Sequence, residues 1–360
     1  MGDRSTTVQA LLGWYDGARR DLPWRRTRDP YAVWISEAML QQTRVETVEG
    51  YWRRFLDALP TVADLAAADE EGVLALWSGL GYYRRARSLQ AAARALVERH
   101  GGRFPRTRAE LLALPGIGPY TAGALLSIAF DLPEPLVDGN VARVLARRFA
   151  LELDPASGAG QRELWRRAAE LVPAARAGDW NQALMELGAT VCTPRAPRCG
   201  ACPWGGECLA RARGLSEVLP RARPRPAPLE VELTIAVAER GGALLLRRRP
   251  AGGRMAGLWE FPTREEAAAD GATRLFPARF EPPLVVDEEA PLGRLAHAIT
   301  RHRIRARVLP ARPRGPLAGR AGGAEWIERG RLADLGLTGM ARKVLRLLPR
   351  DACASPSEVS

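Results

Sequence analysis

A short arginine- and proline-rich stretch divides this chain into two parts with different hydrophobic periodicities. Residues 221–228 read RARPRPAP. Proline has no backbone N–H and a fixed φ, so the stretch cannot form a helix and favours an extended, linker-like conformation. Apolar residues before it recur every three or four positions, whereas those between 231 and 237 alternate with other residues. The first pattern is typical of helices and the second of strands, so one regular fold cannot account for both.

The lengths on the two sides of this stretch suit two domains. The chain has 360 residues, of which 46% are hydrophobic, and at roughly 150 residues per domain this length suggests two cores. We expect a mostly α domain over residues 1–213, a linker over 214–229 and an α+β domain over 230–350. The second domain is expected to end in a helix near 340–348, and residues 351–360 are expected to be disordered.

The charge of the chain indicates a polyanionic partner. Lysine and arginine number 53 against 41 acidic residues, which gives a net charge of +12. Nucleic acid is the first candidate and an anionic membrane surface the second. Lys343 is the only lysine, so no residue before it can be a Schiff-base lysine or a phosphate-loop lysine.

Because no apolar run approaches the roughly 20 residues that span a bilayer and no secretory signal is visible, we expect no membrane association and a cytoplasmic, nucleoid-associated location.

Four cysteines lie close together just before the linker. Cys192, Cys199, Cys202 and Cys208 have the spacing C-x6-C-x2-C-x5-C, so their thiolates can converge on one metal centre. The spacing suits both a [4Fe–4S] cluster and a tetrahedral zinc ion and does not choose between them. Disulfides are not expected in a chain without a secretory signal. The fifth cysteine, Cys353, lies in the tail and has no assigned role.

A glycine-rich turn at residues 114–122, LPGIGPYTA, is expected to open a helix. Gly116 and Gly118 allow the backbone to approach a ligand closely, and the N–H groups of the helix start favour an anion. The turn has no lysine and does not match G-x-x-x-x-G-K-[ST], so it is not a nucleotide-triphosphate loop. A helix-hairpin-helix motif that holds a DNA phosphate fits the pattern better.

Two acidic residues occupy positions suited to catalysis. Glu37 lies among apolar residues, where burial would raise the pKa of its carboxyl group and suit it to general-acid chemistry. The alternative for Glu37 is an ordinary acid in the first turn of a helix after Ser36. Asp138 precedes Gly139 and Asn140, where a helix would begin, so its alternative role is an N-cap carboxylate.

Together these segments resemble one known family. The strings that carry the resemblance, besides the four cysteines, are residues 34–43 (WISEAMLQQT), 76–87 (LWSGLGYYRRAR), 114–122, 137–144 (VDGNVARV), 181–189 (NQALMELGA) and 257–262 (GLWEFP). They are similar to those of MutY-type adenine DNA glycosylases, which combine a helix-hairpin-helix glycosylase domain with a C-terminal Nudix-like domain. The resemblance implies a monomer that removes adenine mispaired with 8-oxoguanine or guanine in double-stranded DNA, and a [4Fe–4S] cluster at residues 192–208.

The related endonuclease III lineage is the nearest alternative. It shares the hairpin, the aspartate and the cluster, but places a lysine for covalent attack on the sugar two residues after the second hairpin glycine. Here that position is Tyr120. The resemblance therefore implies base removal without a lysine-driven strand cut.

The resemblance also implies roles for individual residues. Glu37 would protonate adenine N7, and Asp138 would stabilise or trap the oxocarbenium-like sugar. Tyr120 and Asn140 would position the sugar and Asp138. The remaining residues would contact the extruded adenine (Arg25 and Gln182) or the DNA (Gln42 and Tyr82 in the space left in the base stack, with Gly116 and Gly118 at the phosphate).

The second domain departs from its relatives at two places. Residues 257–263 resemble the opening of a Nudix hydrolase, but residues 264–270, REEAAAD, do not reproduce the R-E-x-x-E-E arrangement that holds Mg²⁺. We therefore expect the fold without nucleotide hydrolysis. The family reads 8-oxoguanine with a loop of the form H-x-F-[ST]-H. Here residues 297–301 read HAITR, which keeps the hydroxyl as Thr300 but substitutes Ile299 and Arg301. The preference for 8-oxoguanine over guanine stays open, as does a non-enzymatic iron–sulfur DNA-binding protein.

Overall fold

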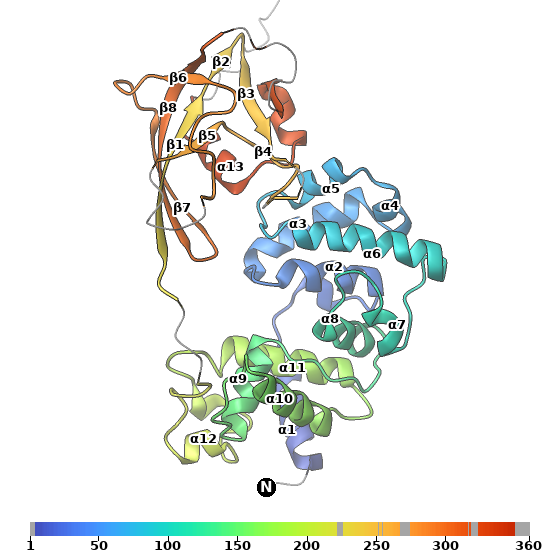
Figure 1. Ribbon diagram of the computed structural model, residues 1–360. Helices are drawn as coiled ribbons and strands as arrows, with labels where there is room; N and C mark the ends of the chain where they lie inside the picture. The colour runs from blue at the N-terminus through green and yellow to red at the C-terminus, as the bar shows by residue number, and fades with distance from the viewer. Residues whose placement is uncertain are drawn as a thin grey trace, which may run out of the picture. The chain divides into compact units, whose positions relative to one another are not determined.

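The computed structural model describes residues 4–221, 226–250, 252–253, 255–266, 274–315, 317 and 323–349. They form two compact units (Figure 1). Unit 1 comprises Met1–Ala68 and Arg87–Pro224, and unit 2 comprises Asp69–Ala86 and Arg225–Ser360. The predicted domains, 1–213 and 230–350, are each continuous in sequence. The two units are not, because the segment Asp69–Ala86 belongs to unit 2 together with the C-terminal part of the chain.

Unit 1 is helical, as predicted. Its helices are α1 (Arg4–Ala18), α2 (Pro30–Leu40), α3 (Val45–Ala58), α4 (Val62–Ala67), most of α6 (Arg84–His100), α7 (Arg108–Leu112), α8 (Pro119–Ala124), α9 (Gly139–Arg148), α10 (Gly158–Leu171), α11 (Ala177–Thr190) and α12 (Leu209–Ala212). Helix α11 packs against α1 and α9 and contributes the fully buried Trp180 to the core. Among the described residues, no helix is long and apolar enough to cross a membrane.

The predicted glycine turn joins α7 to α8. Gly116 has a φ of +74°, and a Cβ at this position would lie 2.4 Å from Ser88 Cβ. Only glycine fits there without displacing the neighbouring helix. Gly118 is the N-cap of α8 and Pro119 its first residue, and the helix continues as a π-helical turn over Leu125–Ala129. The expected hairpin opening a helix is therefore confirmed.

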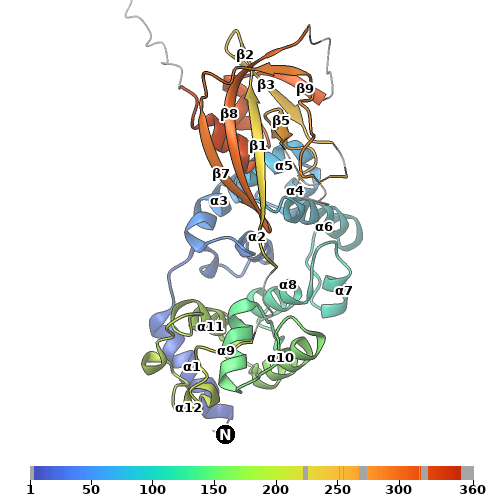
Figure 2. The ribbon, with the colours of Figure 1, turned by 60° about the vertical axis from the view of Figure 1, so that its left-hand side comes forward.

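The described residues of unit 2 form two sheets. Its strands are β1 (Leu229–Val237), β2 (Glu239–Arg240), β3 (Ala243–Arg248), β4 (Trp259–Glu260), β5 (Thr263–Glu265), β6 (Leu284–Val286), β7 (Gly293–Ile299), β8 (His302–Pro313) and β9 (Ala324–Glu328). One sheet has the order β5-β1-β8-β6, with β7 also on β8, and the other has β2-β3-β4, with β9 on β3. Strands β1 and β8 run parallel; β7, β8 and β1 lie side by side in Figure 2. The helices of unit 2 include α5 (Glu70–Trp77) and α13 (Gly339–Leu345).

The predicted strand at 231–237 and the terminal helix near 340–348 are confirmed as β1 and α13. Their apolar residues share one core with Trp259 and Phe261. Three predictions fall wholly or partly outside the described residues. They are the linker over 214–229 (at residues 222–225), the stretch 264–270 that departs from the Nudix helix (at residues 267–270), and the tail 351–360 with Cys353.

Candidate active site and cysteine centre

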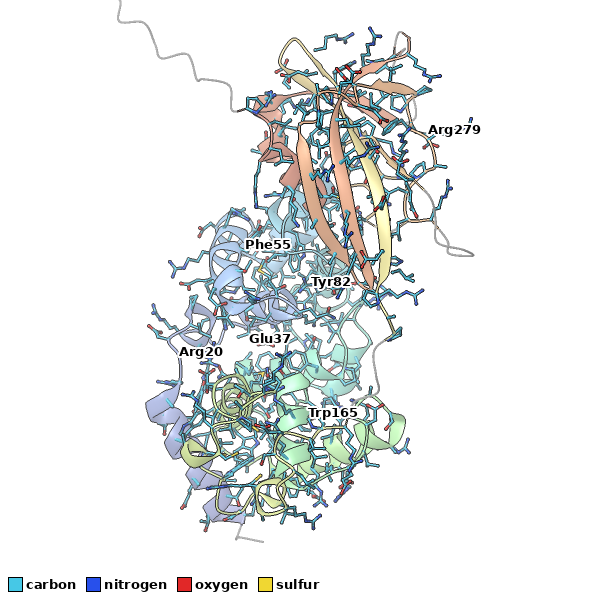
Figure 3. The ribbon with its side chains drawn as sticks, turned by 90° about the vertical axis from the view of Figure 1, so that its left-hand side faces the viewer. Arg20, Glu37, Phe55, Tyr82, Trp165 and Arg279 are labelled. Atoms are coloured by element: carbon cyan, nitrogen blue, oxygen red, sulfur yellow. The ribbon has the colours of Figure 1, made fainter. Side chains whose placement is uncertain are left out.

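A cavity of about 650 Å³ in unit 1 collects the predicted catalytic residues. Its lining comes from five stretches of the chain: residues 20–25, the end of α2 with the loop to α3, the start of α8, the start of α9, and the middle and end of α11. Glu37, Tyr120, Asp138 and Asn140 all line it, although as many as 103 positions separate them in the sequence (140 − 37). Figure 3 labels Glu37 and Arg20, both of which line this cavity.

Glu37 is a buried carboxyl group with a raised pKa. Helix α2 begins at Pro30 after the N-cap Asp29, so Glu37 lies more than one turn into the helix and the first-turn alternative is wrong. Its side chain is 4% exposed. Burial raises its pKa from 4.5 to about 7; the hydrogen bond from the Tyr120 hydroxyl opposes this and the nearby charge of Asp138 adds to it. Near neutral pH, Glu37 is thus poised to give up a proton.

Asp138 is the N-cap of α9, as expected, and also faces the cavity. Its Oδ1 accepts the Val141 N–H at 2.7 Å, and its Oδ2 accepts the Asn140 side-chain amide at 3.0 Å. Burial raises the pKa of Asp138, while these two hydrogen bonds favour the carboxylate and oppose the rise. A role as N-cap and a role in the cavity are therefore compatible, because the carboxyl group that caps α9 also faces the cavity.

Asn140 is connected to the cysteine segment through Arg143. The Arg143 guanidinium donates to Asn140 Oδ1 at 2.9 Å and to the Cys192 carbonyl at 2.8 Å. A Cβ at Gly188 would lie 2.6 Å from Asn140 Cβ, so α11 packs closely on the start of α9. Arg143, which the sequence did not single out, thus joins the residue that holds Asp138 to the first cysteine.

Tyr120 pairs with the other carboxyl group. The resemblance implies that it positions the sugar and Asp138, but its hydroxyl donates to Glu37 Oε2 and also contacts Met185 Sδ at 3.6 Å. In this structure Tyr120 therefore hydrogen-bonds to Glu37, and Asn140 hydrogen-bonds to Asp138.

Glu186 and Arg20 are site residues that the sequence analysis missed. Glu186 is fully buried, and its carboxylate accepts hydrogen bonds from Arg20 at 2.7 and 2.9 Å and from Arg25 at 2.7 Å. Burial would raise the pKa of Glu186, but the hydrogen bonds and charges of the two arginines hold it below its ordinary value. The predicted Arg25 and Gln182 both line the cavity. The acidic side chain of Glu186 within the mostly apolar string 181–189 could have indicated this residue from the sequence.

The other predicted DNA contacts are placed within their own units. Gln42 lines the cavity of unit 1 with a φ of 60°. In unit 2, Tyr82 is 52% exposed with a φ of 48°, and Thr300 is exposed with a φ of 53° in the turn between β7 and β8. Positive φ is uncommon for residues other than glycine, and each of these side chains stands at a turn or helix end.

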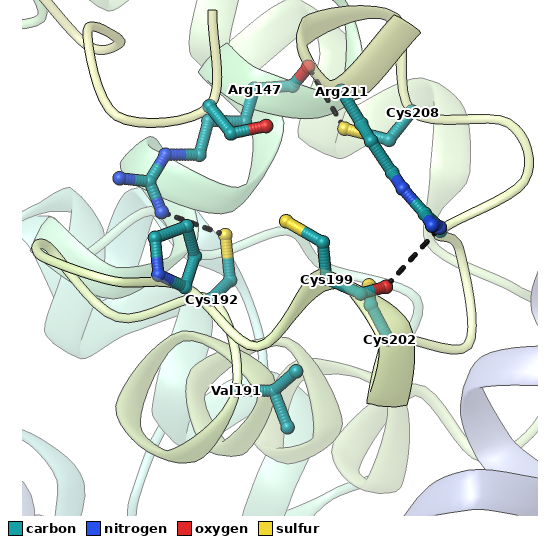
Figure 4. A pocket seen from close by; sticks show the side chains of 10 residues that line it. Arg147, Val191, Cys192, Cys199, Cys202, Cys208 and Arg211 are labelled. Carbon is teal, nitrogen blue, oxygen red and sulfur yellow. Dashed lines mark hydrogen bonds between the residues drawn. The ribbon is translucent and has the colours of Figure 1, made fainter. Parts of the chain in front are cut away.

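The four cysteines line one pocket (Figure 4). None forms a disulfide, and the Arg147 guanidinium donates to Cys192 Sγ at 3.3 Å, a contact that suits a thiolate. Within the part of the chain that the structure describes, no three or more His, Cys, Asp or Glu side chains are arranged to hold a metal ion.

Comparisons with known proteins give the family of the chain. Residues 35–170 match the family described as HhH-GPD superfamily base excision DNA repair protein, and residues 234–347 match the NUDIX domain. The chain is 39% identical to the adenine DNA glycosylase of Homo sapiens over 94% of this chain and 73% of that protein. This chain belongs to the adenine DNA glycosylase family. The adenine DNA glycosylase of Rattus norvegicus is also 39% identical, over 96% of this chain and 78% of its own.

Solved structures support the fold. A thermostable thymine-DNA glycosylase is 32% identical with a TM-score of 0.53 and covers 58% of this chain and 97% of its own. Endonuclease III in a non-covalent DNA complex is 23% identical with a TM-score of 0.50 and covers 60% of this chain and 99% of its own, which supports the fold alone. The predicted family, the two-part fold and an adenine DNA glycosylase of base excision repair are thus confirmed.

Proposed function

We propose that this enzyme hydrolyses the N-glycosidic bond of adenine mispaired with 8-oxoguanine or guanine in double-stranded DNA, without cutting the strand. The observation that carries the proposal is the cavity in which the buried, protonatable Glu37 and the hydrogen-bonded Asp138 lie together. Enzymes that hydrolyse a glycosidic bond use two carboxyl groups in distinct environments, one as the acid and one as the carboxylate.

The chemistry follows from the two environments. Adenine in duplex DNA is inaccessible, so it must leave the base stack and enter the cavity. Glu37 gives its proton to adenine N7, and the electron pair of the bond between C1′ and N9 leaves with the base. Asp138, as the carboxylate, stabilises or traps the positive charge that develops at the sugar. Water then adds at C1′ and loses its proton to Glu37, which restores both groups.

We also propose that Cys192, Cys199, Cys202 and Cys208 hold a [4Fe–4S] cluster. Their shared pocket and the guanidinium of Arg147 at Cys192 Sγ support an anionic group there. When bound, the cluster would tie the loop around these cysteines to α9, which carries Arg147 and has Asp138 as its N-cap.

A glycosylase assay with and without alkali tests the proposed reaction. On duplexes with adenine opposite 8-oxoguanine or guanine, we expect adenine release, and strand breaks only after alkali treatment. The reason is that Tyr120 stands where a strand-cutting relative has lysine, and a tyrosine cannot form a Schiff base. Duplexes with adenine opposite cytosine or thymine are the controls. Strand breaks without alkali, or a borohydride-trapped adduct of the intact enzyme, would contradict the hydrolytic mechanism.

Thr300 is expected to contribute to the choice of opposite base. Its exposed hydroxyl in the turn between β7 and β8 donates to the Ile299 carbonyl at 2.7 Å and can still accept a hydrogen bond from a base edge. We expect Thr300→Ala to reduce the ratio of rates on 8-oxoguanine and guanine mispairs about threefold to tenfold, measured by single-turnover kinetics. Thr193→Ala, which removes a hydroxyl of a half-buried threonine in unit 1, should leave the ratio unchanged. A large preference that survives Thr300→Ala removes this turn from the reading role.

A further inference from the structure

The segment Asp69–Ala86 folds with a part of the chain that lies far from it in sequence. Helix α5, at its start, belongs to unit 2 together with Arg225–Ser360. Glu71 accepts a hydrogen bond from the Trp259 indole at 3.0 Å. A Cβ at Gly336 would lie 3.2 Å from Leu74 Cβ, so the two backbones approach closely. Helix α5 therefore packs against Trp259 of β4 and against the chain at Gly336.

The end of this segment is held at a single carbonyl group. The Leu337 carbonyl accepts the Ser78 hydroxyl at 2.8 Å and the Tyr83 hydroxyl at 2.9 Å. Arg342 Nε donates to Ser78 Oγ at 2.8 Å, so the Ser78 hydroxyl is both donor and acceptor. Ser78 and Tyr83 are buried, and removing either hydroxyl leaves a buried polar group with fewer partners, which costs more than the loss of an exposed hydrogen bond.

The loop between these two residues carries an exposed aromatic ring in an unfavourable backbone conformation. Gly79, Gly81 and Tyr82 have φ values of 109°, 72° and 48°. Such a conformation costs free energy for a bulky residue and persists where the surroundings enforce it. The Trp77 indole donates to the Gly81 carbonyl at 3.1 Å, and the Arg85 guanidinium lies 5.5 Å from the centre of the Tyr82 ring. The ring itself remains 52% exposed.

We propose that Leu337 and Arg342 act through Ser78 and Tyr83 as a clamp that holds the Tyr82 loop ready to enter the DNA base stack. Ser78 and Tyr83 are positioning residues, and Tyr82 is the group that contacts DNA. The inference rests on the proposed function, which gives Tyr82 a DNA duplex to enter. The C-terminal part of the chain then has a role in extruding the adenine in addition to its role at the opposite base.

A double-mutant cycle tests the clamp. The variant Ser78→Ala/Tyr83→Phe removes both hydroxyl donors and keeps the tyrosine ring volume, and it is made with Tyr82 intact and in a Tyr82→Ala background. With Tyr82 intact, we expect single-turnover adenine release to slow roughly tenfold. In the Tyr82→Ala background we expect no further loss, because the clamp then has no ring to position. Thr263→Val, which removes another buried hydroxyl that donates to a carbonyl of unit 2, is the matched control and should leave the rate unchanged.

The fluorescence of 2-aminopurine placed beside the mispaired adenine gives an independent readout of unstacking. We expect the clamp variant to lose the fluorescence increase that the wild-type protein causes. Equal losses in both backgrounds, or no loss with Tyr82 intact, would overturn the proposal. If the double variant has a low Tm, Tyr83→Phe alone completes the cycle. A wild-type protein that unstacks the DNA but releases no adenine would refute the proposed function and leave the clamp measurable.

Discussion

Glu37→Gln is expected to lower single-turnover adenine release about a thousandfold, while the affinity for mispaired DNA stays within about threefold of wild type. Glutamine keeps the size of the side chain and an oxygen that accepts the Tyr120 hydroxyl, so the cavity should keep its shape. It cannot supply a proton to the leaving base. The measurement is single-turnover excision beside a gel-shift titration on the same duplex.

The matched control is Glu134→Gln. Glu134 is a half-buried acid of unit 1 that pairs with Arg108 away from the cavity, and its replacement should change excision less than about twofold. An excision rate for Glu37→Gln close to that of wild type would remove Glu37 from the role of acid.

The pH dependence of the wild-type enzyme provides a second check on the same group. Because the acid must be protonated, the excision rate should fall as the pH rises through about 7, the pKa of Glu37. The free energy of unfolding should also fall as the pH rises. The folded pKa is raised above the ordinary value of 4.5, so the protonated group contributes stability that is fully present below 4.5 and lost as the pH rises through about 7. Glu37→Gln should therefore raise the Tm relative to wild type more at pH 8 than at pH 4.5.

Local sequence patterns predicted those features that depend on neighbouring residues. Asp138 before a glycine and an asparagine indicated a helix start, and the structure has the N-cap there. Gly116 in a turn before Pro119 indicated the hairpin. The structure has the hairpin there, and only glycine fits beside Ser88. The alternation from 231 to 237 gave β1. The resemblance added the roles, which no local pattern could supply.

Features that depend on distant residues could not be predicted in the same way. Glu186 and Arg20 are 166 positions apart, and nothing near either residue indicates its partner. The Ser78 hydroxyl donates to the Leu337 carbonyl across 259 positions. A division of the chain at its linker therefore places α5 in the N-terminal domain, although the helix belongs to the C-terminal unit. The pairing of Tyr120 with Glu37 is of the same kind, since it depends on how α2 and α8 approach.

Asp138→Asn should separate the chemical role of this residue from its structural one. Asparagine is as good an N-cap as aspartate and can still accept the Val141 N–H that Asp138 now accepts at 2.7 Å, so the Tm should change little. Excision should nevertheless fall about a thousandfold, because a neutral amide cannot stabilise or trap a cationic sugar. Single-turnover kinetics and thermal unfolding are measured on the same preparation.

Asp29→Asn is the matched control, because Asp29 caps α2 through the N–H groups of Tyr31 and Ala32 and does not line the cavity. It should keep both the Tm and the excision rate. If Asp138→Asn instead loses Tm and activity together, its main role is to cap α9. If it retains activity, the sugar cation is stabilised by another group. Loss of activity at constant Tm is the outcome expected here, since the carboxylate is hydrogen-bonded at the start of a helix and also faces the cavity that holds Glu37.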